Sequence, residues 1–365
     1  MLNKVRVTRL VEIMSGEDVD AMLIGPSADL EYMAGYSPLP DERFKCLVVL
    51  SDGGCFYISP SLYFEETRNK IGADIKIYVW DDKSGFLGAM ESANRDFKLD
   101  KKRIAVNEGI RAVDLIDIQT VIKSDFVKGT NILEELRIIK DEEEIKNLKY
   151  ASKIADQVME EIIKFIRPGM KERAVKDKIK ELCFEKGANG LSFEPLVASG
   201  PNSSMPHYCG EDRFIREKDI VVLDFGCRYN GYCSDITRTV FVGEVSEEEK
   251  RIYDIVAAAN LEGERAVKAG ISAGEVDRKT RSVIEKAGYG EYFIHRTGHG
   301  IGVSVHEAPY IKEGNKQILQ KGMVFSVEPG IYLPDRFGIR IEDLVLVKDG
   351  GVEVLNAFPK ELVVI

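Results

Sequence analysis

The chain has 365 residues, of which 44% are hydrophobic and 31% are charged, a composition typical of folded globular proteins. Its formal net charge of −10 argues against nucleic acid or an anionic membrane surface as a partner, because both bind concentrated positive charge. The six cysteines include no C-x-x-C pair, which argues against a disulfide scaffold and a thiolate metal site.

A chain of this length exceeds one hydrophobic core, and we expect two domains. Residues 1–128 predict a small α/β domain. They open on an amphipathic helix without the apolar segment of a secretory signal, so we expect a cytoplasmic protein. The stretches "DAMLIG", "CLVVLSDGGCFYIS" and "DIKIYVW" are typical of strands, with "DGG" as a hairpin turn and a helix near residues 61–70.

Residues 129–365 predict a second domain built on an internal repeat. A long helical stretch begins near Ile132 and stops at "RPG". From there "FIRPGMKERAVKDKIKELCFEKGA" superimposes on "AVKAGISAGEVDRKTRSVIEKAGY", with Gly169 on Gly270. Each copy has the pattern of a helix end, a glycine turn and a second helix, and strand-like segments follow both. The pattern predicts a duplicated helix-and-sheet unit with a site between its halves, and an α+β fold class overall.

A first hairpin, "DIVVLDFGCRYNGYCSDITRTVFVG", carries two aspartates. Its central Asn-Gly pair is a strong turn signal, and a loop at that pair places Asp224 opposite Thr237 and Asp235 opposite Gly226. Because side chains alternate between faces, Asp224 and Asp235 would be diagonal neighbours on one face, roughly 7 Å apart. Two carboxylates in that arrangement repel each other, so we expect a positive charge between them.

A second hairpin, "MVFSVEPGIYLPDRFGIRIEDLVLV", carries two glutamates. A loop centred on Asp335 would place Glu328 directly opposite Glu342. Arg340 lies two residues before Glu342 on the same face, where it could steady that carboxylate as a hydrogen-bond donor.

Three of the four histidines lie within "HRTGHGIGVSVHE", residues 295–307. The stretch lacks the glutamate of the zincin motif HExxH and is interrupted by glycines. His299 is our candidate metal ligand, because its flanking glycines allow close backbone approach. His306 is expected to donate to the substrate carbonyl or the oxyanion, and His295 and His207 to transfer protons or contact substrate.

Four carboxylates with one imidazole form an oxygen-rich ligand set. Such a set suits Mn²⁺ or Co²⁺, with Zn²⁺ as a further candidate. The charge of four carboxylates matches two divalent ions that share bridging ligands and activate a water between them.

The order Asp224, Asp235, His299, Glu328, Glu342 resembles the ligand pattern of the "pita-bread" metallopeptidases, which comprise methionine aminopeptidase, aminopeptidase P and prolidase, along with the metal-free creatinase. The stretches "DFGCRYNGYCSDITRT", "HRTGHGIGVSVHEAP", "VEPGIY" and "RIED" look like the prolidase and aminopeptidase P versions. The resemblance covers nearly the whole chain. It implies a creatinase-like N-terminal domain, residues 1–128, and a pita-bread catalytic domain, residues 129–365.

The resemblance also implies a role for each ligand. Asp224 would chelate one metal ion, and His299 with Glu328 would hold the other. Asp235 and Glu342 would bridge both ions. Glu328 would in addition be the general base.

Further roles follow from the same resemblance. His207 and His306 match histidines that frame the substrate, and His295 matches a proton-shuttle position. Thr237 and Arg340 match positions that support the ligands. The N-terminal domain resembles one that in relatives shapes the site entrance and supports a homodimer.

The function implied is a dinuclear metallo-exopeptidase that cleaves small peptides with proline after the first residue. An Xaa-Pro bond is a tertiary amide without N–H, which sets it apart from other peptide bonds. We favour a dipeptidase (prolidase), because the compact chain resembles small microbial prolidases; its proline carboxylate would need a cation, for which Arg336 and Arg43 are candidates. The alternatives are aminopeptidase P, acting on longer peptides, a methionine aminopeptidase-like activity, and a non-catalytic binding protein on the same fold.

Overall fold

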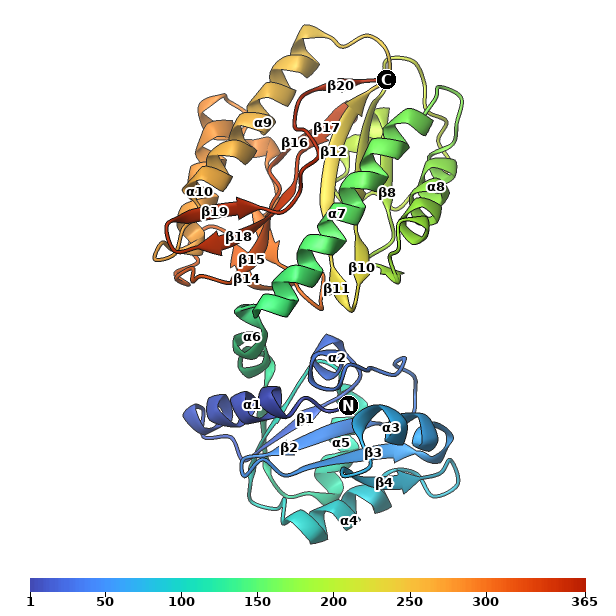
Figure 1. The fold of residues 1–365 in the computed structure, drawn as a ribbon, viewed down its shortest axis with the longest axis vertical. Helices are drawn as coiled ribbons and strands as arrows, with labels where there is room; N and C mark the ends of the chain where they lie inside the picture. The colour runs from blue at the N-terminus through green and yellow to red at the C-terminus, as the bar shows by residue number, and fades with distance from the viewer. The chain divides into compact units, whose positions relative to one another are not determined.

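A computed structural model describes residues 1–365, which divide into two compact units, Met1–Arg137 and Ile138–Ile365 (Figure 1). Helices and sheets occur in both, in agreement with the predicted α+β class. None of the helices combines the length and the hydrophobicity that crossing a membrane requires.

The first unit is a six-stranded mixed sheet in the order β4-β3-β2-β1-β5-β6. Strands β2 and β3 form the predicted antiparallel hairpin around "DGG", whereas β1, β5 and β6 run parallel. Phe56 stacks on Phe97 with ring centroids 4.5 Å apart in the core under the sheet. The elements are α1 (Lys4–Gly16), β1 (Ala21–Ile24), α2 (Ala28–Ala34), β2 (Cys46–Leu50), β3 (Cys55–Pro60), η1 (Ser61–Tyr63), α3 (Phe64–Ile71), β4 (Lys76–Trp80), α4 (Leu87–Phe97), β5 (Arg103–Val106), α5 (Ala112–Val121) and β6 (Asp125–Lys128).

The long helical stretch expected from Ile132 is interrupted, and that prediction was wrong. Two helices replace it, α6 (Thr130–Ile138) and α7 (Glu142–Phe165). Asp141 starts the second: its carboxylate accepts the Glu144 backbone N–H at 2.8 Å, while the Glu144 carboxylate accepts the Asp141 N–H at 2.9 Å. This capping box satisfies backbone donors that an uninterrupted helix would have used internally.

The predicted repeat is present in the second unit. Gly169 and Gly270 lie in the turn after the first helix of each copy with φ of 86° and 94°, and their N–H groups donate to the carbonyl oxygens of Ile215 and Leu319. A second helix follows each glycine turn. The helices of the two copies are α7 and α8 (Glu172–Glu185), then α9 (Glu247–Ala266) and α10 (Ala273–Lys286).

The strands of the second unit are mostly antiparallel. Two larger sheets have the orders β20-β12-β9-β8 and β14-β13-β15-β18-β19, and the smaller ones are β11-β10-β7 and β16-β17. The elements are β7 (Gly190–Leu191), β8 (Leu196–Ser199), η2 (Gly200–Ser204), β9 (Ile220–Phe225), β10 (Cys227–Tyr229), β11 (Tyr232–Cys233), β12 (Ile236–Phe241), η3 (Gly290–Tyr292), β13 (Gly298–Gly300), β14 (Glu307–Ile311), β15 (Val324–Val327), β16 (Gly330–Leu333), β17 (Phe337–Arg340), β18 (Asp343–Lys348), β19 (Gly351–Val354) and β20 (Val363–Val364).

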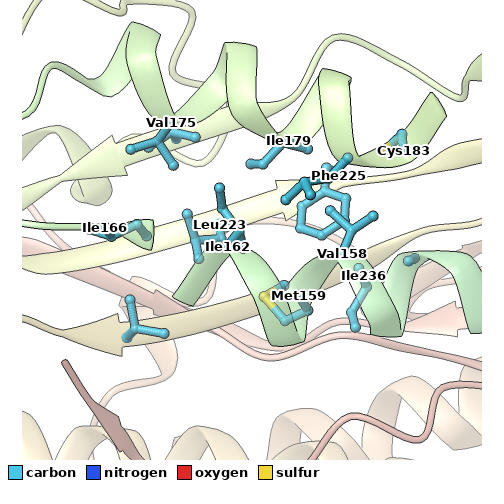
Figure 2. Packing of buried hydrophobic residues seen from close by; sticks show 14 of the residues in the cluster. Val158, Met159, Ile162, Ile166, Val175, Ile179, Cys183, Leu223, Phe225 and Ile236 are labelled. Atoms are coloured by element: carbon cyan, nitrogen blue, oxygen red, sulfur yellow. The ribbon is translucent and has the colours of Figure 1, made fainter. Parts of the chain in front are cut away.

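Helices cover the strands that carry the candidate site. Figure 2 shows Val158 and Ile162 of α7 and Ile179 of α8 packed against Leu223 and Phe225 of β9, all buried. Strand β9 therefore has an apolar face held by the helices, and the alternating residue Asp224 points the other way.

Candidate metal centre

The first hairpin has the predicted register. Thr237 pairs with Asp224 in β12 and β9, and Asn230 and Gly231 form the turn with positive φ values of 49° and 84°. Strand β9 ends at Phe225, and the continuation of the hairpin, β10 and β11, belongs to another sheet. Asp235 is the residue directly before β12 and is buried, with 4% of its surface exposed.

The second hairpin also has the predicted register. Gly330 pairs with Arg340 in β16 and β17, and Val327 pairs with Asp343 in β15 and β18. Glu328 and Glu342 lie in the gap between these two pairings. The backbone N–H of Glu342 donates to Thr237 at 3.1 Å, which joins the second hairpin to the first.

His299 enters the site on β13 between two glycines that no other residue could replace without rearrangement. A Cβ added to Gly298 would lie 1.8 Å from the carbonyl oxygen of Ser326, and one added to Gly300 would lie 2.1 Å from that of Ala308. The sequence prediction that these glycines allow close backbone approach is therefore confirmed.

The His299 ring has one nitrogen free for a metal ion. Nδ1 donates to the carbonyl oxygen of Gly300 at 3.1 Å, and Nε2 lies 3.4 Å from Glu328 Oε1 and 3.8 Å from Asp235 Oδ2. Burial, followed by repulsion between the protonated forms of His299 and His306, lowers the pKa of His299 to about 3. The imidazole is thus neutral, with a lone pair at Nε2 aimed at two carboxylates.

One cavity of about 610 Å³ collects the predicted site residues. A volume of this size suits a small-molecule ligand. Of the residues predicted as metal ligands, catalytic groups or their supports, only Thr237 lies outside the lining, where it donates to Glu342. The predicted residues in the lining are His207, Asp224, Asp235, His295, His299, His306, Glu328, Arg340 and Glu342.

The clustered carboxylates perturb one another. Burial raises the pKa of Asp235 and of Glu342 well above the usual range, and the neighbouring acids raise both further. Burial raises the pKa of Glu328 to about 7. Each shift has the same origin: negative charge is unfavourable in a dry site unless a cation compensates it.

The donor set fits divalent cations. Ligand atoms of Asp235, His299 and Glu342 lie within 4.8 Å of one another. Oδ1 of Asp224 and Oδ1 of Asp235 are buried without a hydrogen-bond partner, although buried carboxylate oxygens are normally satisfied. Orphaned oxygens beside a neutral imidazole form the oxygen-rich ligand set that such ions prefer.

Arg340 has a different partner from the one expected. Its Nη2 donates to Asp224 Oδ2 at 2.5 Å rather than to Glu342. It reaches Glu342 only through Thr237, whose Oγ1 accepts from Arg340 Nε at 3.2 Å and donates to Glu342 Oε2 at 2.7 Å. The alternation of side chains along the strand predicts which face of the hairpin Arg340 lies on. Its hydrogen-bond partner depends in addition on how the two hairpins pack against each other.

Tyr332 is a site residue that the sequence reasoning missed. Its hydroxyl accepts from Arg340 Nη1 at 2.9 Å and donates to His295 Nε2 at 2.8 Å, since His295 Nδ1 already donates to the carbonyl oxygen of Arg296 at 2.7 Å. Strand alternation could have identified Tyr332 as a site residue, because it lies four residues after Glu328 and therefore on the same face of the hairpin.

The other two histidines lie on the open side of the cavity. His306 packs edge-on against His299 with ring centroids 4.3 Å apart, and burial with the nearby positive charge of Arg296 lowers the pKa of His306. His207 is exposed and precedes Tyr208, whose hydroxyl donates to the buried Glu172 at 3.0 Å.

The two arginines proposed to hold a substrate carboxylate both have carboxylate partners within their own units. Arg43 belongs to the first unit, where it pairs with Asp82 at 2.9 Å. Arg336 is on the surface and pairs with Glu248 at 2.6 Å. The cavity is instead lined by Arg296, which the sequence reasoning passed over within the histidine stretch.

Comparisons with known proteins agree with this architecture. A family model described as Metallopeptidase family M24 matches residues 146–349, and one described as Creatinase/Prolidase N-terminal domain matches residues 6–139. The chain is 34% identical over 360 residues to an Xaa-Pro dipeptidase of Pyrococcus horikoshii, with 98% of each chain covered.

Solved structures resemble the whole chain. A recombinant prolidase from Thermococcus sibiricus matches with a TM-score of 0.96 and 38% identity over 100% of both chains. An X-Pro aminopeptidase from Thermotoga maritima matches with a TM-score of 0.86 and 33% identity, over 98% of this chain and 99% of that one. The predicted combination of a creatinase-type first domain and a metallopeptidase second domain is confirmed.

Proposed function

The chain belongs to metallopeptidase family M24, and from that premise we propose that it is an Xaa-Pro dipeptidase with two divalent metal ions at the cavity of the second unit. The observation that carries the proposal is the convergence of four acidic side chains and one neutral imidazole on that cavity. Full-length similarity to an Xaa-Pro dipeptidase and to a prolidase supports the choice of substrate.

Five residues would hold the metal ions. Asp224 would bind one ion, His299 and Glu328 the other, and Asp235 and Glu342 both. When bound, such ions supply Lewis acidity, which makes water a better nucleophile at neutral pH and stabilises negative charge on a carbonyl oxygen. We expect Mn²⁺ or Co²⁺, with Zn²⁺ as the less favoured candidate.

The protein's own groups move the proton and orient the substrate. Glu328 is the candidate base, because burial brings its pKa to about 7 in the absence of metal, and its carboxylate lies beside His299. His306 and His207 line the same cavity, where their N–H groups could donate to the substrate carbonyl. His295, with both nitrogens already hydrogen-bonded, is better suited to holding Tyr332 and Arg340 than to direct contact.

The cavity also suits a proline ring. Phe193, Pro195, Leu196 and Val305 line it and make part of its wall apolar. A proline leaving group has no amide N–H that would require an acceptor on such a wall. The free ammonium of the first residue is attracted by the carboxylates. We further propose that the enzyme is a cytoplasmic homodimer.

The alternative function is that of an Xaa-Pro aminopeptidase acting on longer peptides, which similarity to the Thermotoga maritima enzyme supports. Protein loaded with Mn²⁺ or Co²⁺ is assayed against Ala-Pro, Ala-Pro-Ala and Met-Ala-Ser. We expect hydrolysis of Ala-Pro at much the highest kcat/KM. Comparable hydrolysis of Ala-Pro-Ala would favour the aminopeptidase, and hydrolysis of Met-Ala-Ser alone would overturn the assignment to proline.

A further inference from the structure

A dipeptide substrate brings the negative charge of its own C-terminal carboxylate to an acidic cavity. The carboxylate carbon of Xaa-Pro lies three bonds beyond the scissile carbonyl carbon, about 3 Å away, because the proline ring fixes the intervening torsion angle. It must therefore enter the cavity close to Asp224, Asp235, Glu328 and Glu342. Two divalent ions would compensate those four acids but not a fifth carboxylate, which therefore needs a further cation that the protein has not already neutralised.

Three cationic side chains line the cavity, namely Lys176, Arg296 and Arg340. Arg340 is committed, because it donates to Asp224, Thr237 and Tyr332. Lys176 is 96% removed from solvent, with 4% exposed, and its Nζ donates to the carbonyl oxygen of Gly210 at 2.9 Å.

Arg296 is the uncommitted cation. Its guanidinium makes no hydrogen bond or ion pair within the chain and lies over the ring of Tyr310, with Cζ 5.0 Å from the ring centroid. Arg296 lines the same cavity as His306 and Glu328.

The backbone around Arg296 is fixed on both sides. The carbonyl oxygen of Arg296 accepts from His295 Nδ1 at 2.7 Å, and that of His295 accepts from Arg281 Nη2 at 2.8 Å. On the other side Thr297 donates through its backbone N–H and its hydroxyl to the buried Asp277, at 3.2 and 2.8 Å. A cation without an internal partner is thus presented from a rigid segment, as an anion-binding residue should be.

We propose that Arg296 binds the C-terminal carboxylate of an Xaa-Pro dipeptide and so selects dipeptides over longer peptides. The inference rests on the proposed function and assigns its specificity to one residue. A guanidinium can hold a carboxylate through two parallel hydrogen bonds. An additional residue after proline replaces that carboxylate by an uncharged amide and leaves the cation without its partner.

The test compares Ala-Pro with Ala-Pro-NH₂, which differ only in the terminal charge. The ratio of their kcat/KM values is measured for the Mn²⁺-loaded wild type, Arg296→Met, Arg296→Lys and two comparison variants, Arg336→Met and Lys176→Met. We expect Arg296→Met to lower the ratio of kcat/KM for Ala-Pro to kcat/KM for Ala-Pro-NH₂ on the order of 100-fold. Arg296→Lys should lower it less, because lysine keeps the positive charge but cannot form two parallel hydrogen bonds to a carboxylate. Arg336→Met, a surface arginine paired with Glu248, should leave the ratio unchanged.

Two results would overturn the assignment. One is an equal fall of both rates in Arg296→Met, which would mean a general effect on the site. The other is a lower ratio of kcat/KM for Ala-Pro to that for Ala-Pro-NH₂ in Lys176→Met together with an unchanged ratio in Arg296→Met, which would assign the carboxylate to Lys176.

Binding of the product gives a readout that needs no turnover. Affinities for L-proline and L-prolinamide are measured by calorimetry on the same proteins. Arg296→Met should weaken proline selectively, and equal weakening of both ligands would contradict the proposal. A wild type that hydrolyses no Xaa-Pro peptide would refute the proposed function, while these affinities would still decide the role of Arg296.

Discussion

At the scale of single residues, the protein's own cations do not compensate all the acidic side chains of the site. Asp224 is compensated by Arg340 at 2.5 Å, but Asp235 and Glu342 have no cation of their own. Thr237 donates to Glu342 and orients it. The free Oδ1 atoms of Asp224 and Asp235 then mark where positive charge is missing.

Removing the charge of one bridging carboxylate should therefore stop the reaction without unfolding the protein. Asp235→Asn and Glu342→Gln keep the size of each side chain, and we expect kcat/KM for Ala-Pro to fall by about 1,000-fold or more. Metal content is measured on the same samples, with circular dichroism as the check on folding. Activity close to that of the wild type with unchanged metal content would show that the ligands are assigned wrongly.

At the scale of elements, two hairpins and one glycine-flanked strand bring the ligands together. The hairpin registers followed from the sequence because an Asn-Gly turn and alternating side chains define them locally. The partner of Arg340 could not be predicted from the sequence, because it depends on how the two hairpins pack against each other. The helix break at Asp141 could not be predicted either, because the capping box there competes with continuation of the helix. Arg296 was missed for a related reason: what distinguishes it is a lack of partners, which only the folded chain reveals.

The glycines beside His299 provide a test of this element. Gly298→Ala would place a methyl group against the carbonyl oxygen of Ser326, and we expect the free energy of unfolding to fall by about 2–4 kcal/mol. Gly350→Ala is the matched control, because no atom lies within 4 Å of the added Cβ. Denaturant unfolding of the two variants measures the difference, and equal stability would contradict the close approach of β13 and β15.

At the scale of the whole molecule, the buried acids link stability to pH and metal. In the metal-free protein the folded-state pKa of Glu328 is raised to about 7, so its contribution to stability is present at acidic pH and is lost as the pH rises through 7. Asp235 and Glu342 shift in the same direction. Divalent ions bind the deprotonated acids and should reverse the loss.

We therefore expect Tm of the metal-free protein to fall by about 3 °C or more between pH 5.5 and pH 7.5. Saturating Mn²⁺ should raise Tm more at pH 7.5 than at pH 5.5. Glu328→Gln, which cannot ionise, should make the metal-free profile flatter. If Tm of the metal-free protein instead rises between pH 5.5 and pH 7.5, the buried acids do not destabilise the folded protein when they are charged.

The convergence of five side chains on a pair of divalent ions is tested most directly by anomalous diffraction from crystals grown with Mn²⁺. The account predicts two anomalous peaks in the cavity of the second unit, with Asp224, Asp235, His299, Glu328 and Glu342 as the protein ligands. Crystals saturated with Mn²⁺ that show no peak there, or peaks held by other side chains, would contradict it.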